Sequence, residues 1–136
     1  MAQLEPSVVV HLRGHQSDGQ LALIELVIAA GAEGPPLHVH PAHAEGFYVL
    51  EGQVLVQVGD EVRPGRAGDF FFAASGTPHT FANHTQRDAR LLLTCTPAGF
   101  EAYFDRLARG IGGPPTEDAL AVGPPIGAPF DQERRP

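Results

Sequence analysis

Three histidines and one glutamate are spaced so that they can meet around a single metal ion. His38 and His40 lie two residues apart in a β-favouring run, so their side chains project from the same face of a strand, about 6.6 Å apart. Pro41 cannot donate to a strand ladder and should end that strand, so that Glu45 can return on the next one. His79 begins a later short strand, after a turn that contains glycine and proline.

Three neutral imidazoles and a carboxylate suit a divalent transition metal. The set fits Fe, Mn, Ni, Co, Cu or Zn and does not distinguish them. Around an octahedral ion, four protein ligands would leave two neighbouring positions open for a substrate or for oxygen. We therefore predict one metal per chain, bound by His38, His40, Glu45 and His79.

The residues around this set receive separate interpretations. Glu45 can be a metal ligand, or a catalytic base beside the metal that takes a proton from a bound substrate. His43, in a turn between two alanines, is interpreted as a solvated surface residue and is left out of the ligand set. Cys95 lies in an apolar run, which favours a buried, inert thiol over a nucleophile.

The same residues fall within two motifs that resemble the paired motifs of the cupin family. The first is His38-x-His40-x4-Glu45-x6-Gly52, and the second is Gly68-x5-Ala74-x-Gly76-x2-His79-x3-Asn83. The chain departs from the family pattern at two turn positions, where Ala32 replaces an expected glycine and Ala74 an expected proline. The flanking segments are similar to small, single-domain cupins of the quercetin-dioxygenase-like type.

The resemblance implies an all-β fold, a double-stranded β-helix (cupin or jelly-roll) barrel with a short C-terminal helix. It also implies that His38, His40, Glu45 and His79 line the interior of the barrel and bind the metal. Cupins include oxygenases, cyclases, isomerases and proteins without known activity, so the resemblance alone does not select a reaction.

The elements that must position these residues are visible as short β-favouring runs broken by turn residues. They predict an antiparallel sandwich or barrel with strands at residues 8–13, 21–29, 37–40, 46–50, 53–58, 69–72, 79–82 and 90–95. Gly52 and Gly59-Asp60 predict tight reversals that join neighbouring strands as hairpins. Alternating phenylalanines favour either a cavity lining or plain core packing: Phe47, Phe70, Phe72 and Phe81.

Near its end the chain changes character. The apolar residues Phe100, Tyr103, Phe104 and Leu107 recur at helical spacing and predict a helix of about ten residues, ended by Gly110. We expect residues 1–112 to form the barrel domain with this helix. Residues 113–136 are rich in proline and glycine and are interpreted as a wrapping or trailing tail, with at most a helical turn after Thr116.

Composition limits the partners. The formal net charge of −7 repels phosphate backbones, so nucleic acids and anionic membranes are not expected partners, and a small molecule is. The single cysteine and the lack of a recognisable signal peptide at the start of this sequence favour a cytoplasmic location. The apolar runs 8–13 and 21–29 would leave a sheet edge able to pair with another chain if uncovered, which predicts a homodimer.

Three functions fit the sequence, and we favour the first. It is an oxygenase in which a redox metal binds a small aromatic or enol-type substrate together with oxygen. The second is a non-redox metal enzyme, such as a cyclase, isomerase or lyase, in which Glu45 or His43 moves protons. The third is a non-catalytic module that binds a small molecule.

Overall fold

The structure, a computed structural model, describes residues 7–110 and 118–127, and within them it contains ten strands and one α-helix. The helix α1 spans Glu101–Ala108, and a short 3-10 helix spans Gly14–Gln16. The strands are β1 (Ser7–Leu12), β2 (Ala22–Ile28), β3 (Leu37–Val39), β4 (Ala44–Glu51), β5 (Gln53–Val58), β6 (Glu61–Arg66), β7 (Phe70–Ala73), β8 (His79–Ala82), β9 (Ala89–Thr96) and β10 (Leu120–Gly123).

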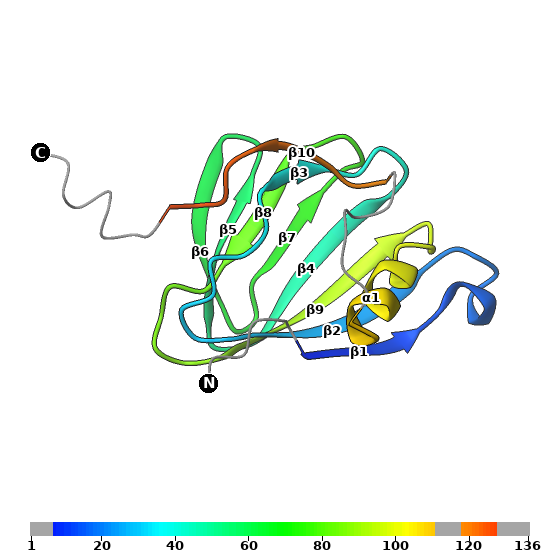
Figure 1. Ribbon diagram of the computed structural model, residues 1–136, viewed down its shortest axis with the longest axis horizontal. Coiled ribbons are helices and arrows are strands. Elements are labelled where there is room, and N and C mark those ends of the chain that lie inside the picture. The colour runs from blue at the N-terminus through cyan, green and yellow to red at the C-terminus, as the bar shows by residue number, and fades with distance from the viewer. Residues whose placement is uncertain (1–6, 111–117, 128–136) are drawn as a thin grey trace, which may run out of the picture.

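Two five-stranded sheets form the body of the protein (Figure 1). The first has the order β1-β2-β9-β4-β7 and the second the order β10-β3-β8-β5-β6, and every pair of neighbours is antiparallel. This is the double-stranded β-helix sandwich that the sequence predicted. The short helix near the C-terminus is also confirmed.

The core lies between the sheets and follows the period of two along each strand. In β2, Ile24 and Leu26 are buried and their neighbours are half-exposed, and Leu91 and Leu93 of β9 repeat the pattern. Phe47 of β4 is fully buried among them. Each such side chain contributes about 1.5–3 kcal/mol through its burial, so alternation fixes which face of each strand turns inward.

One of the two predicted reversals is a hairpin and the other is not. β5 and β6 pair through the turn at Gly59-Asp60, with Val58 opposite Glu61. At Gly52 the chain instead crosses from one sheet to the other, because β4 pairs with β7 and β9 while β5 pairs with β6 and β8. Gly52 has φ +81°, and a Cβ there would lie 2.8 Å from the carbonyl oxygen of Asp88. The crossing therefore requires glycine.

The segment expected to wrap or trail contains a strand. β10 pairs with β3, with Leu120 opposite Val39 and Ala121 opposite His38. The helical turn expected after Thr116 falls largely outside the described residues. The domain boundary at residue 112 stays a prediction. Among the described residues, no helix is long and apolar enough to cross a membrane.

Candidate metal centre

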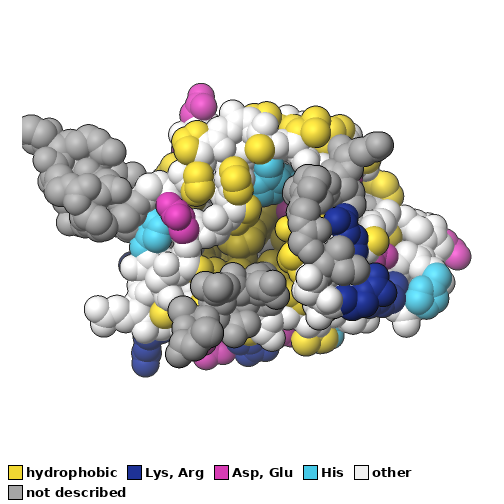
Figure 2. All heavy atoms as spheres, viewed as in Figure 1, with side chains coloured by type: hydrophobic (Ala, Val, Ile, Leu, Met, Phe, Trp, Pro, Cys, Tyr) yellow, Lys and Arg dark blue, Asp and Glu magenta, His cyan; other side chains and the backbone are white. Residues whose placement is uncertain are grey.

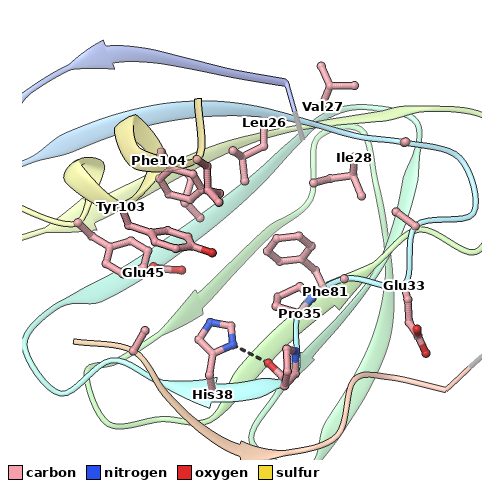
Figure 3. Close-up of a pocket in the computed structure, with 18 of the residues that line it drawn as sticks. Leu26, Val27, Ile28, Glu33, Pro35, His38, Glu45, Phe81, Tyr103 and Phe104 are labelled. Atoms are coloured by element: carbon pink, nitrogen blue, oxygen red, sulfur yellow. Dashed lines mark hydrogen bonds between the residues drawn. The ribbon is translucent and has the colours of Figure 1, made fainter. Parts of the chain in front are cut away.

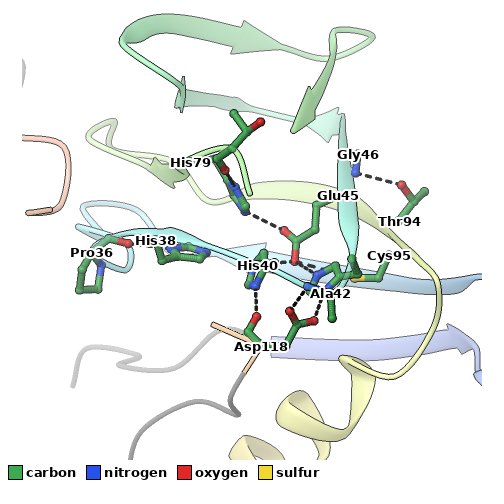
Figure 4. Close-up of polar contacts among 12 residues, drawn as sticks. Pro36, His38, His40, Ala42, Glu45, Gly46, His79, Thr94, Cys95 and Asp118 are labelled. Carbon is green, nitrogen blue, oxygen red and sulfur yellow. Dashed lines mark hydrogen bonds and ion pairs between the residues drawn. The ribbon is translucent and has the colours of Figure 1, made fainter. Parts of the chain in front are cut away.

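The antiparallel pairing of β3 and β8 places two of the predicted ligands face to face. His38 of β3 is the register partner of His79 of β8, and their ring centroids are 4.6 Å apart. His40 follows β3 directly, and its ring lies 4.8 Å from that of His38 and 4.9 Å from that of His79. The candidate ligand atoms of these three histidines all lie within 4.8 Å of one another. The sequence-predicted histidines therefore form one cluster (Figure 4).

Each ring is held by a backbone carbonyl at its Nδ1 atom. Carbonyl oxygens only accept hydrogen bonds, so each Nδ1 carries the proton and donates it. The acceptors are Pro36 for His38 at 2.7 Å, Asp118 for His40 at 2.6 Å and Thr77 for His79 at 2.9 Å. This arrangement leaves the Nε2 lone pair of each neutral ring turned away from the backbone, which is how metal-binding histidines are oriented in proteins.

Two further observations fit a role as metal ligands for His40 and His38. The Nε2 atom of His40 is buried and has no hydrogen-bond partner among the described residues, although Glu45 Oε2 lies 2.9 Å away. Burial, opposed by the bond to Pro36, lowers the pKa of His38 to about 4. His38 is therefore neutral at pH 7, the state in which an imidazole binds a metal.

Glu45 joins the cluster from the other sheet. It lies on β4 between Ala73 and Cys95 and is only 3% exposed. Its Oε1 is 3.3 Å from Nε2 of His79, and its Oε2 is 2.7 Å from Nε2 of His43. Burial raises the pKa of Glu45, but the contacts with His40, His43 and His79 outweigh it and hold the pKa well below its usual range.

The interpretation of His43 as a solvated surface residue is wrong. Its side chain is buried, with Nε2 bonded to Glu45 and Nδ1 bonded to Asp118 Oδ2 at 2.5 Å. Burial lowers the pKa of His43, and these two carboxylates raise it to a net value above the ordinary one. Both ring nitrogens are hydrogen-bonded to carboxylates, so His43 links Glu45 to Asp118 and holds the Glu45 carboxylate in place. The sequence signal for this position was the spacing of two residues between His43 and Glu45, which places both side chains on one face of a strand.

Asp118 is the site residue that sequence reasoning missed. Its carboxylate accepts from the backbone N–H of Ala42 and contacts His43, while its carbonyl accepts from His40. It lies 75 residues beyond His43, so no local spacing connects it to the histidines. Cys95 is buried, as predicted. Burial, with the nearby Glu45, raises the pKa of its thiol, which argues against a nucleophile.

A cavity of about 720 Å³ opens beside the cluster. Figure 2 shows the opening, with hydrophobic side chains inside it, and Figure 3 shows His38 and Glu45 facing the same space as Phe104 and Phe81. Its lining includes Tyr103 and Leu107 of α1, but no arginine or lysine among the described residues. The helix thus closes the cavity with the apolar face predicted from its spacing.

The predicted aromatic positions divide between three environments. Phe81 lines the cavity, and Phe47 packs in the core with its ring 5.5 Å from that of His79. Phe70 and Phe72 point outward from β7 and are 55% and 56% exposed, because Phe71 between them takes the inward position. Neither outward ring contributes to the cavity.

The chain is similar to known proteins over its central part. Residues 24–95 match the Cupin_2 family, described as a cupin domain. Quercetin 2,3-dioxygenase from Bacillus subtilis is 34% identical over 67 residues, which are 48% of this chain and 20% of that protein. The probable oxidoreductase virH from Hypocrea virens is 30% identical over 82 residues, 58% of this chain and 37% of that protein. The chain thus covers well under two thirds of both relatives.

Solved structures agree on the fold. KdgF from Halomonas sp. superposes with a TM-score of 0.65 at 20% identity, covering 75% of this chain and 87% of that one. A conserved protein with a double-stranded β-helix domain from Klebsiella pneumoniae gives 0.61 at 20% identity, covering 73% and 83%. The family match spans more than half of the sequence, and the largely buried histidine cluster is consistent with the metal sites typical of that family. The chain therefore belongs to the cupin family.

Proposed function

We propose that this cupin is a mononuclear metal-dependent oxygenase that acts on a small, uncharged aromatic or enol-type molecule. One observation carries the proposal. Three histidines, each oriented through Nδ1 by a carbonyl, gather with a buried glutamate beside a largely apolar cavity. The proposed ligands are His38, His40, Glu45 and His79, with one divalent transition metal per chain. When bound, such a metal supplies redox chemistry toward oxygen and polarises a substrate oxygen.

The cavity supports a neutral substrate. Its volume of about 720 Å³ lies within the range of small-molecule sites. Its lining is mainly aliphatic and aromatic, and its charged members, Glu33 and Glu45, are both acidic. Apart from the proposed metal ion, a carboxylate or phosphate group would meet no cationic side chain in the described lining, and its burial there would carry a substantial desolvation cost. A flat, uncharged molecule can instead bury its rings against Phe81, Phe104 and Leu107.

Glu45 supplies the proton chemistry in this proposal. Its low pKa keeps it ionised at neutral pH, and it lines the cavity in which we propose that the enol binds. A carboxylate so placed can accept the enol proton as the substrate oxygen becomes anionic. The hydrogen bond from His43 to Oε2 orients the carboxylate. The names of the two sequence relatives, a dioxygenase and a probable oxidoreductase, also support oxygen chemistry.

The test is oxygen consumption by protein reconstituted separately with each candidate metal. The panel contains flavonols and 1,3-diketones as neutral enols, with their O-methyl ethers as matched non-enol controls. We expect uptake with at least one redox metal, dependent on the free enol. The His79→Ala variant should lose this activity, and the His15→Ala variant, changed at an exposed histidine outside the cavity lining, should retain it. Metal-loaded protein that binds enols but consumes no oxygen would contradict the proposal.

A second function is favoured by the hydrogen bonds that His43 makes to two carboxylates. Glu45, His43 and Asp118 form a continuous hydrogen-bonded series that leads from the cavity toward the partly exposed carboxylate of Asp118. Such a series suits a non-redox cyclase, isomerase or lyase in which Glu45 takes up and returns a proton. Turnover of an enol substrate under anaerobic conditions with zinc would favour this function over the oxygenase.

A further inference from the structure

Asp118 makes three hydrogen bonds at the metal centre, to His40, His43 and the backbone of Ala42, from a part of the chain far from them in sequence. Its carbonyl oxygen accepts from Nδ1 of His40 at 2.6 Å. Its carboxylate binds Nδ1 of His43 and the backbone N–H of Ala42, both at 2.5 Å. Figure 4 shows Asp118 beneath His40 and Ala42, on the side opposite His79.

These contacts reach two of the proposed metal ligands. The carbonyl fixes the ring of His40 with its Nε2 lone pair turned toward the cluster. The carboxylate holds His43, and Nε2 of His43 holds Oε2 of Glu45 at 2.7 Å. One residue therefore orients a nitrogen ligand directly and an oxygen ligand through an intermediate ring. Both ligands are buried, so the orientation is not averaged by solvent.

The position of Asp118 ties these contacts to the pairing of a strand. It lies two residues before β10, where Leu120 and Ala121 are the partners of Val39 and His38. β3, which carries His38 and leads directly into His40, lies between β8 and β10 in the sheet. The 118–123 segment thus supports the metal centre twice, through the backbone pairing of β10 with β3 and through the carbonyl and carboxylate of Asp118.

We propose that Asp118 is a positioning residue for the metal centre, and that docking of the 118–123 segment and metal binding stabilise each other. The inference rests on the proposed metal site. Outer hydrogen-bond partners of metal ligands commonly set 10- to 100-fold of the metal affinity. Coupling between two binding events is reciprocal, so a segment that raises metal affinity must itself be held more firmly when the metal is bound.

The first experiment is a Co²⁺ titration of metal-stripped full-length protein, followed by visible absorption, whose band positions report ligand geometry. We expect Asp118→Asn to lower Co²⁺ affinity about 10-fold and to shift the absorption bands. The matched control is Asp69→Asn, which makes the same chemical change at a carboxylate that also accepts from a backbone N–H, that of Arg66. Asp69 lies just before β7, whose Phe70 pairs with Tyr48, three residues along β4 from Glu45.

A double-variant cycle tests whether the carboxylate of Asp118 acts through His43. His43→Gln breaks the route to Glu45, and both single variants leave the backbone carbonyl contact with His40 in place. If the carboxylate acts through His43, Asp118→Asn adds little to the effect of His43→Gln on Co²⁺ affinity. Fully additive losses in the double variant would overturn the route through His43.

The second experiment needs no variant, so it stays informative even if Asp118→Asn does not fold. Amide hydrogen exchange of the wild-type chain is compared with and without Co²⁺. We expect metal to slow exchange about 10-fold in residues 118–123 and to leave β1 unchanged, because β2 and β9 separate β1 from the strand that carries Glu45. Equal exchange in 118–123, or an Asp118→Asn variant with wild-type affinity and spectrum, overturns the inference alone. Wild-type protein that binds no Co²⁺ overturns the proposed metal site as well.

Discussion

His38 on β3 and His79 on β8 are direct partners in an antiparallel pair, although 41 positions separate them in the sequence. The pairing brings their rings to 4.6 Å, so a shift of one residue in this register would turn His79 to the opposite face. The metal centre is therefore a property of strand register, and the strands flanking β3 and β8 determine whether the ligands meet.

Removing either histidine of this pair should empty the site. We expect His38→Ala and His79→Ala to reduce bound metal from about one per chain to near zero, because each removes one of four ligands. The measurement is metal content by mass spectrometry on protein purified without added metal. His15→Ala, an exposed histidine remote from the cluster in sequence, is the matched control. Full metal content in both ligand variants would show that the metal binds elsewhere.

The ligand pattern could be predicted from the sequence because its signals are local. The spacing of His38 and His40 gives a common face, and Pro41 marks where the strand ends. The same rule of two applied to Glu45 would have placed His43 inward, but its alanine neighbours suggested a solvated turn. His43 is buried because the carboxylate of Asp118 pairs with it. That contact depends on the tertiary path of the chain.

Strand positions were predictable, but their partners were less so. The alternation in β2 and β9 marks the inward face of each strand. Gly52 marks a turn, but a glycine with positive φ serves equally in a hairpin and in a crossing between sheets. The strand β10 was missed because its short apolar run lies among prolines and glycines, and it becomes a strand only where β3 offers an unpaired edge.

The charge of the cavity lining should control which ligands bind. Leu107→Arg places a cation beside the cavity, whereas Ala108→Arg adds the same group to the exposed face of α1. We expect metal-free wild-type protein to bind a neutral flavonol more tightly than a carboxylated analogue. Leu107→Arg should improve binding of the carboxylated analogue by about tenfold, equivalent to about 1.4 kcal/mol. Isothermal titration calorimetry measures the affinity of each protein for the neutral flavonol and for the carboxylated analogue. An equal gain in affinity from Ala108→Arg would refute a role for the charge of the cavity lining.

The homodimer predicted from the apolar strands stays a prediction, and the structure narrows where it can form. β2 is an interior strand, and within residues 7–110 and 118–127 β1 and β7 are the edges of the first sheet. β7 carries the exposed Phe70 and Phe72, and an unpaired edge is self-complementary with that of a second copy. We expect a dimer by light scattering at micromolar concentration, a monomer for Phe72→Asp and a dimer for Val9→Asp. A monomeric wild-type protein would reject the prediction.

Acid should weaken the attachment of α1 through Glu101. Its Oε2 accepts from the N–H of Gly14 at 2.8 Å and its Oε1 from that of Gly99 at 2.6 Å. Burial raises the pKa of Glu101, but these backbone bonds outweigh it and the net pKa lies below the ordinary value. A carboxyl with a depressed folded pKa contributes stability above its unfolded pKa of about 4.3, and this stability is lost as pH falls through the folded value.

The wild-type melting temperature should therefore fall as pH decreases from 5 to 3, and Glu101→Gln should flatten this fall while costing about 1–2 kcal/mol at pH 7. The control is Glu61→Gln, an equal charge change at an exposed carboxylate. A slope unchanged in Glu101→Gln would show that other carboxylates govern acid stability. Because Glu101 begins the helix that presents Phe104 to the cavity, loss of its bonds should also weaken flavonol binding over the same pH range.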